Sequence, residues 1–217
     1  MTSSPRQLAK RLVMRYAPTR LYPRPVSALA PERLYAYFDA LWQRRDLEAA
    51  IVEVGCWLGG TATLAFRLLR NTGFPKRYVC IDTFGGFVPE QFEHDLAHGT
   101  RAGRHSDFAG NSLDTVSRLL RHYGVADVEL VQADIARVPE SRLPERVAVG
   151  LVDVDLEVPV YEGLQRLYPH LADGGVLLVD DCPPGYNWPG ARIGYKRFVD
   201  ERGLEEDYFM GMGIVRR

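Results

Sequence analysis

Cysteine is scarce in this sequence, with three among 217 residues, and long apolar runs are missing. Cys56, Cys80 and Cys182 are odd in number and widely spaced, which argues against a disulfide framework and favours reduced thiols in the cytoplasm. No stretch approaches the roughly 20 apolar residues of a membrane span. Since the net charge is only −1, we expect no nucleic-acid partner and no general attraction to anionic membranes.

Acidic residues are missing from the first 31 positions, which carry six lysine or arginine residues. In this stretch Leu8, Leu12 and Tyr16 lie on one stripe of a helix. Such a basic amphipathic arm can contact a membrane, a substrate or a second subunit, so a homo-oligomer is one alternative. We expect instead that it packs against its own domain, and we assign residues 1–45 to an N-terminal helical arm or lid region.

Helical periodicity continues over residues 31–45. Its apolar stripe at three- and four-residue spacing consists of Leu34, Tyr35, Phe38, Leu41 and Trp42.

Short apolar segments alternate with helical patterns along the rest of the chain. Residues 51–54 and 77–82 read as strands on either side of a helix at 61–70, which makes a βαβ unit. Similar strands end at Asp134, Asp153 and Asp180, and the segment 204–217 reads as a closing strand pair. The strands are almost wholly apolar, which favours a mostly parallel sheet covered on both faces.

Acidic side chains stand where the predicted strands end. Because parallel strands present their carboxyl ends at one edge of a sheet, where such folds bind ligands, we expect these residues to gather there. They are Glu53 with Gly55, Asp82, Asp134, Asp153 with Asp155, and Asp180 with Asp181. A complete acidic rim indicates a site rather than isolated capping residues.

The glycine-rich turn EVGCWLGG at 53–60 lacks the G-x-G-x-x-G spacing of a dinucleotide site. Glu53 beside the turn disfavours phosphate and suits an ammonium or a hydroxyl group. Asp82 is placed to accept hydrogen bonds from a ribose diol, and Asp134 from an exocyclic amine. These groups indicate S-adenosylmethionine rather than a nicotinamide cofactor; the alternative is that the glycines serve only the turn and helix packing.

Three carboxylates fall at the ends of neighbouring strands. Adjacent parallel strands lie about 5 Å apart, so Asp153, Asp180 and Asp181 can converge. A hard oxygen site of this kind suits Mg²⁺ or Ca²⁺, which would relieve the repulsion between the two adjacent aspartates. A hydroxyl bound to such an ion becomes more acidic, and a sulfonium donor beside it predicts methyl transfer to oxygen. The alternative is that Asp180 and Asp181 only cap the following helix.

Two further patterns are weaker. His94 and His98 have the spacing of metal ligands on a helix, but their polar, glycine-rich segment lacks cysteine, so we expect a lid rather than a zinc centre. Tyr186 and Trp188 are placed either to stack on an acceptor ring or to pack their loop against the helix beneath it.

Four segments resemble the macrocin and mycinamicin O-methyltransferase family. They are EVGCWLGGTAT at 53–63, IDTFGGF at 81–87, VDVDLEVPVYEGLQRLYPHLADGGVLLVDD at 152–181 and GIVRR at 213–217. The resemblance covers about residue 30 to the C-terminus. It implies a class I, S-adenosylmethionine- and Mg²⁺-dependent enzyme that methylates deoxysugar hydroxyls on natural products. The segment at 153–163 departs from the family pattern DGD-x-Y-x-S/T, which leaves the acceptor open.

The resemblance also assigns roles to residues. It implies that Asp153, Asp180 and Asp181 bind the metal, the acceptor's vicinal hydroxyls complete its shell, and Asp153 also acts as general base. The expected cofactor-binding residues are Glu53, Gly55, Trp57, Gly59, Thr61, Asp82, Thr83, Phe84, Gln132, Ala133, Asp134 and Asp153.

Together these features predict a Rossmann-like class I methyltransferase fold, with a seven-stranded, mostly parallel α/β sheet, an antiparallel last strand and helices on both faces. Residues 46–217 form the S-adenosylmethionine-binding catalytic domain. The expected activity is Mg²⁺-dependent O-methylation of a small-molecule acceptor, a sugar or another natural product. Alternatives are a catechol or phenolic O-methyltransferase, a non-catalytic S-adenosylmethionine-binding module, and a nicotinamide oxidoreductase, which the missing glycine spacing disfavours.

Overall fold

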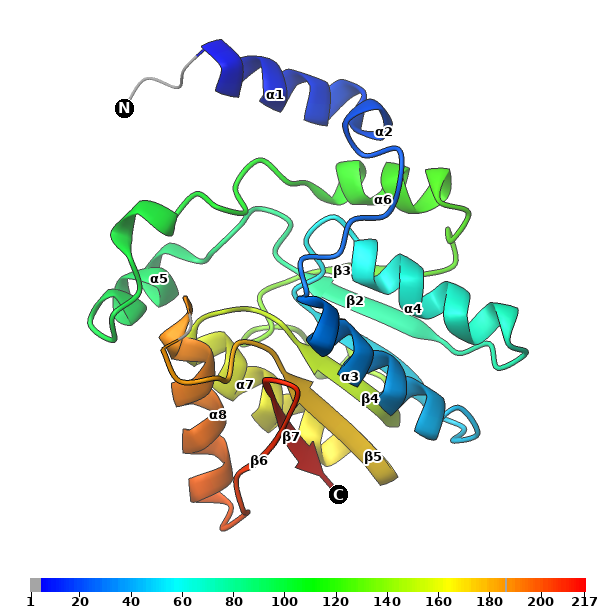
Figure 1. The fold of residues 1–217 in the computed structure, drawn as a ribbon, viewed down its shortest axis with the longest axis vertical. Helices are drawn as coiled ribbons and strands as arrows, with labels where there is room; N and C mark the ends of the chain where they lie inside the picture. The colour runs from blue at the N-terminus through cyan, green and yellow to red at the C-terminus, as the bar shows by residue number, and fades with distance from the viewer. Residues whose placement is uncertain (1–4, 186) are drawn as a thin grey trace.

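The computed structural model describes residues 5–185 and 187–217, which form one twisted sheet between layers of helices (Figure 1). Its seven strands run in the order β3-β2-β1-β4-β5-β7-β6. They are β1 (Ala50–Val54), β2 (Tyr78–Asp82), β3 (Glu129–Gln132), β4 (Val147–Val152), β5 (Leu171–Val179), β6 (Asp207–Phe209) and β7 (Met212–Arg216). β1 to β5 pair in parallel, and β7 is antiparallel to both of its neighbours. The predicted fold, with its antiparallel last strand, is confirmed.

Helices cover both faces because strand side chains alternate between them. α3 (Pro31–Gln43), α4 (Gly60–Asn71) and α6 (Leu113–His122) pack on the face of β1 that holds Ile51. α7 (Glu157–Leu167) and α8 (Pro189–Glu201) pack on the face that holds Val52. The other helical segments of the described chain are α1 (Pro5–Tyr16), α2 (Pro18–Leu21), α5 (Pro89–Leu96), η1 (Ala102–Arg104), η2 (Glu140–Arg142) and η3 (Tyr168–His170).

The helix predicted over residues 31–45 is α3, but its buried side is rotated from the expected stripe. Tyr35 is 56% exposed and Trp42 is 40% exposed, whereas Tyr37 and Leu41 are buried. Arg33 lies on the same buried side, one helical turn before Tyr37. The expected stripe is therefore wrong at Tyr35 and Trp42. The buried side of α3 includes the charged residue Arg33, which a pattern of apolar residues does not reveal.

α1 lies beside α2 and above α6, away from the sheet (Figure 1). The stripe predicted there faces solvent, with Leu8 55%, Leu12 50% and Tyr16 68% exposed, while Met14 is buried. The C-terminal end of α1 nevertheless packs on its own domain, because the Met14 side chain joins the core and Arg118 of α6 donates a hydrogen bond to the backbone oxygen of Arg15. Helical periodicity identifies an apolar face but not the surface that covers it.

α3, which the sequence assigned to the arm, contributes Tyr37 and Leu41 to the core. The division at residue 45 stays a prediction. Within the described ranges, each helix is too short or too polar to cross a membrane.

Candidate active site

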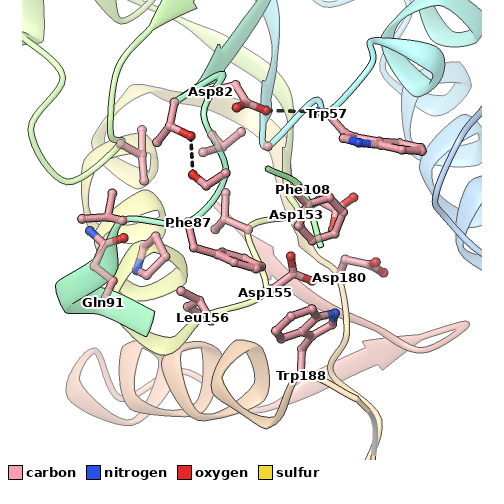
Figure 2. A pocket seen from close by; sticks show the side chains of 18 of the residues that line it. Trp57, Asp82, Phe87, Gln91, Phe108, Asp153, Asp155, Leu156, Asp180 and Trp188 are labelled. Carbon is pink, nitrogen blue, oxygen red and sulfur yellow. Dashed lines mark hydrogen bonds between the residues drawn. The ribbon is translucent and has the colours of Figure 1, made fainter. Parts of the chain in front are cut away.

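A cavity of about 340 Å³ opens at the carboxyl ends of the parallel strands (Figure 2). This is where the acidic rim was expected, and the volume is within the range of small-molecule sites. The expected site residues that line it are Gly55, Trp57, Asp82, Thr83, Ala133, Asp134, Asp153, Asp180 and Asp181. Among the described residues that were expected there, five are not part of its wall: Glu53, Gly59, Thr61, Phe84 and Gln132.

The glycine turn passes very close to the end of β4. Gly55 has a φ of +83°, and a Cβ atom built on it would lie 1.9 Å from the backbone oxygen of Asp153. A side chain at this position therefore meets both backbone strain and a clash with fixed main chain. Glycine at position 55 lets the turn form one wall of the cavity next to the Asp153 carboxylate.

Asp82 holds the turns at the ends of β1 and β2. One carboxylate oxygen accepts hydrogen bonds from the backbone N–H groups of Cys56 and Trp57, at 2.8 and 3.0 Å. The other accepts from the N–H of Phe84 at 2.7 Å. Burial raises the pKa of Asp82, and these backbone hydrogen bonds oppose the shift. Asp82 thus shapes the cavity, and its expected contact with a ribose stays a prediction.

Asp134 also lines the cavity, two residues after β3, the strand that pairs with β2. Its carboxylate accepts hydrogen bonds from the Gln91 side chain of α5 and from the backbone N–H of Ala136, both at 3.0 Å. The hydrogen bond from Gln91 connects α5 to the end of β3. The expected contact of Asp134 with an exocyclic amine stays a prediction.

Glu53 belongs to the core rather than to the cavity. It shares a face of β1 with Ile51, and its carboxyl group accepts a hydrogen bond from the hydroxyl of Tyr78, which lies 2.7 Å from that of Tyr37. Burial raises the pKa of Glu53 to about 8. The group is therefore mostly neutral at pH 7 and directed away from the expected ammonium, because alternation along the strand turns it toward α3 and α4.

Four carboxylates gather where β4 and β5 end. Asp153 and Asp155 follow β4, while Asp180 and Asp181 follow β5, and all four line the cavity. Figure 2 shows Asp155 and Asp180 beside the ring of Trp188. Burial and the neighbouring Asp180 raise the pKa of Asp153 well above its usual range, and burial with Asp181 does the same for Asp155. Burial and mutual repulsion therefore favour the neutral form of these two carboxyl groups unless a cation compensates their charge.

Arg33 is the positive charge at this cluster that the sequence did not reveal. Its Nη1 atom donates to Asp180 at 2.6 Å and to Asp181 at 2.5 Å, and the guanidinium is buried. Burial and the charge of Asp181 raise the pKa of Asp180 to about 6, and Arg33 opposes that shift. One cation thus partly offsets the repulsion between the two carboxylates.

The donor chemistry of this cluster fits Mg²⁺, because oxygen atoms are the ligands that it prefers and the carboxylates repel one another. Among the described residues, the one group of three or more candidate ligands whose donor atoms all lie within 4.8 Å of one another is a different one, around His94 and His98.

Three aromatic rings line part of the cavity and contact one another. Phe87 lies 5.3 Å from Phe108 and 5.1 Å from Trp188, measured between ring centroids. Trp188 is buried, and the Arg104 guanidinium lies 5.0 Å from its ring centroid. Tyr186, which the sequence paired with Trp188, lies outside the described residues.

The doubly wound sheet, the glycine turn and the acidic cavity together define a fold shared with methyltransferases. Residues 33–211 match the model of the macrocin O-methyltransferase (TylF) family, and the chain belongs to that family. The resemblance inferred from the sequence motifs is confirmed.

Two curated relatives illustrate the similarity. The chain is 30% identical to a demethyldecarbamoylnovobiocin O-methyltransferase of Streptomyces niveus, across 62% of this chain and 54% of that protein. It is 27% identical to a mycinamicin III 3''-O-methyltransferase of Micromonospora griseorubida, across 76% of this chain and 65% of that protein. The chain thus matches less than two thirds of either relative's length.

A solved structure of the O-methyltransferase NovP has the same fold. Its TM-score is 0.73 at 18% identity, with 97% of this chain and 98% of that chain covered.

Proposed function

We propose that this protein is an S-adenosylmethionine-dependent O-methyltransferase that methylates a hydroxyl group of a natural-product acceptor, a sugar in the first instance. The observation that carries the proposal is the meeting of two features in one cavity. The glycine turn held by Asp82 forms one wall, and the carboxylates of Asp153, Asp180 and Asp181 lie beside it. Membership of the O-methyltransferase family supports the same activity.

The proposed roles divide the cavity between two ligands. Gly55, Trp57, Asp82, Thr83, Ala133 and Asp134 would hold the cofactor. Asp153, Asp180 and Asp181 would hold Mg²⁺. When bound, S-adenosylmethionine supplies an activated methyl group, and Mg²⁺ supplies positive charge that acidifies a nearby hydroxyl. The Asp153 carboxylate would accept the hydroxyl proton as the acceptor oxygen takes the methyl group.

The aromatic wall supports a second candidate acceptor, a catechol or another phenol. Phe87, Phe108 and Trp188 offer flat apolar surfaces against which an aromatic ring can stack. A sugar can also stack through its C–H face, but it needs more polar partners, and Gln91, Asn111 and Arg33 are in the cavity wall. The sugar is preferred because the family resemblance implies it.

The experiment is to measure S-adenosylhomocysteine release with a panel of sugar diols and phenol diols, with Mg²⁺ and then with EDTA. Turnover that EDTA removes would support the metal role, and the active acceptor would decide between sugar and phenol. Turnover that EDTA leaves unchanged would support methyltransferase activity but contradict the proposed metal-binding role of the aspartates. Binding of the cofactor without turnover on any acceptor would favour a binding module.

The exposed apolar stripe of α1 supports self-association as a further part of this proposal. Light scattering on the full chain would measure its mass in solution. A monomer at all concentrations would contradict it.

A further inference from the structure

Two histidines and a carboxylate converge on the surface beside the cavity, outside the proposed catalytic cluster. His94 Nε2 lies 3.1 Å from Glu157 Oε2, and His98 Nδ1 lies 3.1 Å from the same oxygen atom. The donor atoms of these three residues and of Asp95 all lie within 4.8 Å of one another. His94 is in the last turn of α5, and Glu157 is the first residue of α7.

We propose that His94, His98 and Glu157 form a binding site for a divalent transition metal, Zn²⁺ foremost, that joins α5 to α7. Two imidazoles and one carboxylate are a ligand set that Zn²⁺ uses, with a further position left for water or another ligand. Ligands about 2.0–2.1 Å from a tetrahedral metal lie about 3.3 Å from each other. The 3.1 Å separations between the histidine nitrogens and Glu157 Oε2 are close to that spacing.

Neighbouring residues fix the position of the Glu157 ligand. One oxygen of the buried Asp95 carboxylate accepts a hydrogen bond from the backbone N–H of Glu157 at 3.0 Å. Its other oxygen accepts one from the Thr100 hydroxyl at 3.4 Å. Gly190 of α8 lets these groups approach, because a Cβ there would lie 1.8 Å from Asp95 Oδ2. Asp95 therefore anchors the start of α7 against α5 and fixes the position of Glu157.

The exposure of the ligands suits an ion that enters from solvent. The His94 and His98 side chains are 45% and 34% exposed, whereas that of Glu157 is only 10% exposed. The Arg197 guanidinium lies 4.0 Å from the other oxygen of Glu157, Oε1, whereas Oε2 faces the two histidines. Imidazole ligands favour Zn²⁺ over Mg²⁺, which separates this site from the all-oxygen cluster at Asp180.

A metal here would act on the cavity through the helices that it joins. α5 carries Gln91, which lines the cavity, and α7 begins two residues after Asp155. The segment that contains α5 would then be tied to the end of β4 by a metal as well as by the hydrogen bonds of Asp95.

The test uses the full chain, stripped of metal with EDTA and desalted, and reads out binding rather than turnover. Zn²⁺ is added in competition with a chromogenic zinc chelator, and bound zinc is counted by native mass spectrometry. We expect one Zn²⁺ per wild-type chain. His94→Gln, His98→Gln and Glu157→Gln should each weaken binding by more than the roughly 10–100-fold that loss of an outer-shell partner causes.

Two controls keep the outcome specific. His122→Gln removes an exposed histidine of α6 and should keep wild-type zinc binding. Asp180→Asn alters the oxygen cluster and should also keep it, so a failure of the proposed function would leave this result intact. Zn²⁺ should raise the melting temperature of the wild type and of His122→Gln but not of His94→Gln.

The visible spectrum of the Co²⁺-loaded wild type gives a second measurement that needs no variant to fold. It should show the intense bands of a tetrahedral nitrogen and oxygen site. Failure of the wild type to bind one equivalent of zinc, or binding that survives all three ligand substitutions, would overturn the proposal.

Discussion

Arg33 donates a 2.6 Å hydrogen bond to Asp180 across 147 positions of sequence, and the same nitrogen atom also binds Asp181. The side chains of the arginine and of its carboxylate partners are less than a tenth exposed. The charges are therefore poorly screened, and each group depends on the other for compensation. These ion pairs connect α3 to the carboxyl end of β5, where we propose that Mg²⁺ binds.

Replacing Arg33 by methionine should lower the free energy of unfolding by about 3 kcal/mol or more, because two buried carboxylates lose their counter-charge. Mg²⁺ should then raise the melting temperature of the variant more than that of the wild type, since the ion no longer competes with a guanidinium. Thermal unfolding with and without Mg²⁺ measures both effects. Arg77→Met, which breaks the exposed pair with Glu129, should cost no more than about 1 kcal/mol. A variant Arg33→Met as stable as Arg77→Met would contradict this account.

Asp180→Ala should reduce turnover by about 100-fold or more while leaving S-adenosylhomocysteine binding nearly unchanged, because Asp180 is proposed to serve the metal and not the cofactor. Calorimetric titration with S-adenosylhomocysteine and a turnover assay measure the two functions separately. Asp173→Ala, at an exposed position of β5, is the matched control and should retain both. Equal loss of binding and turnover in Asp180→Ala would reject the division between the two sites.

The sheet could be predicted from the sequence because each strand is identified by the pattern of its own few residues. Inner parallel strands such as β4, which reads VAVGLV and is buried throughout, are apolar on both faces, and helical patterns separate them. The position of the cavity followed from the same pattern, since acidic residues such as Asp153 and Asp180 come directly after buried strands.

The features that the sequence did not reveal depend on contacts between residues far apart in the chain, or on which side of a helix or strand faces the core. Arg33 is buried only because Asp180 and Asp181 receive it, and the helical pattern around it is apolar on more than one side. Glu157 meets His94 across 63 positions through the packing of α5 on α7. The direction of Glu53, by contrast, was available from alternation along β1, because it shares parity with the core residue Ile51.

Glu53→Gln should remove a pH dependence of stability that the wild type has. The pKa of Glu53 is about 8 in the folded protein against an ordinary value of 4.5, because burial disfavours the charged form. The folded state thus keeps a proton that the unfolded state releases. The stability associated with neutral Glu53 is complete below about pH 4.5 and is lost as the pH rises through about 8, where the loss reaches ~4 kcal/mol by one-site linkage.

Glutamine retains an acceptor for the Tyr78 hydroxyl and has no such proton to lose. Thermal unfolding from about pH 5 to pH 8.5 should therefore show the wild type losing stability relative to Glu53→Gln. Glu48→Gln, at an exposed position just before β1, should follow the wild type. Parallel curves for the wild type and Glu53→Gln would show that Glu53 is charged in both states.

Gly55→Ala should lower both the stability of the fold and the affinity of the cofactor site. Gly73→Ala is the control that separates the effect of backbone strain from that of a steric clash. Both glycines have left-handed backbone, with φ of +83° and +88°. A Cβ on Gly73 would meet nothing within 4 Å, whereas a Cβ on Gly55 would lie 1.9 Å from the Asp153 backbone oxygen. Gly73→Ala should therefore cost only the backbone strain, about 1 kcal/mol. Gly55→Ala should cost several times more and weaken S-adenosylhomocysteine binding, because the turn must move away from the end of β4. Denaturant unfolding and ligand titration of the two variants measure this difference, and equal effects would mean that strain alone, not the approach to Asp153, requires glycine at position 55.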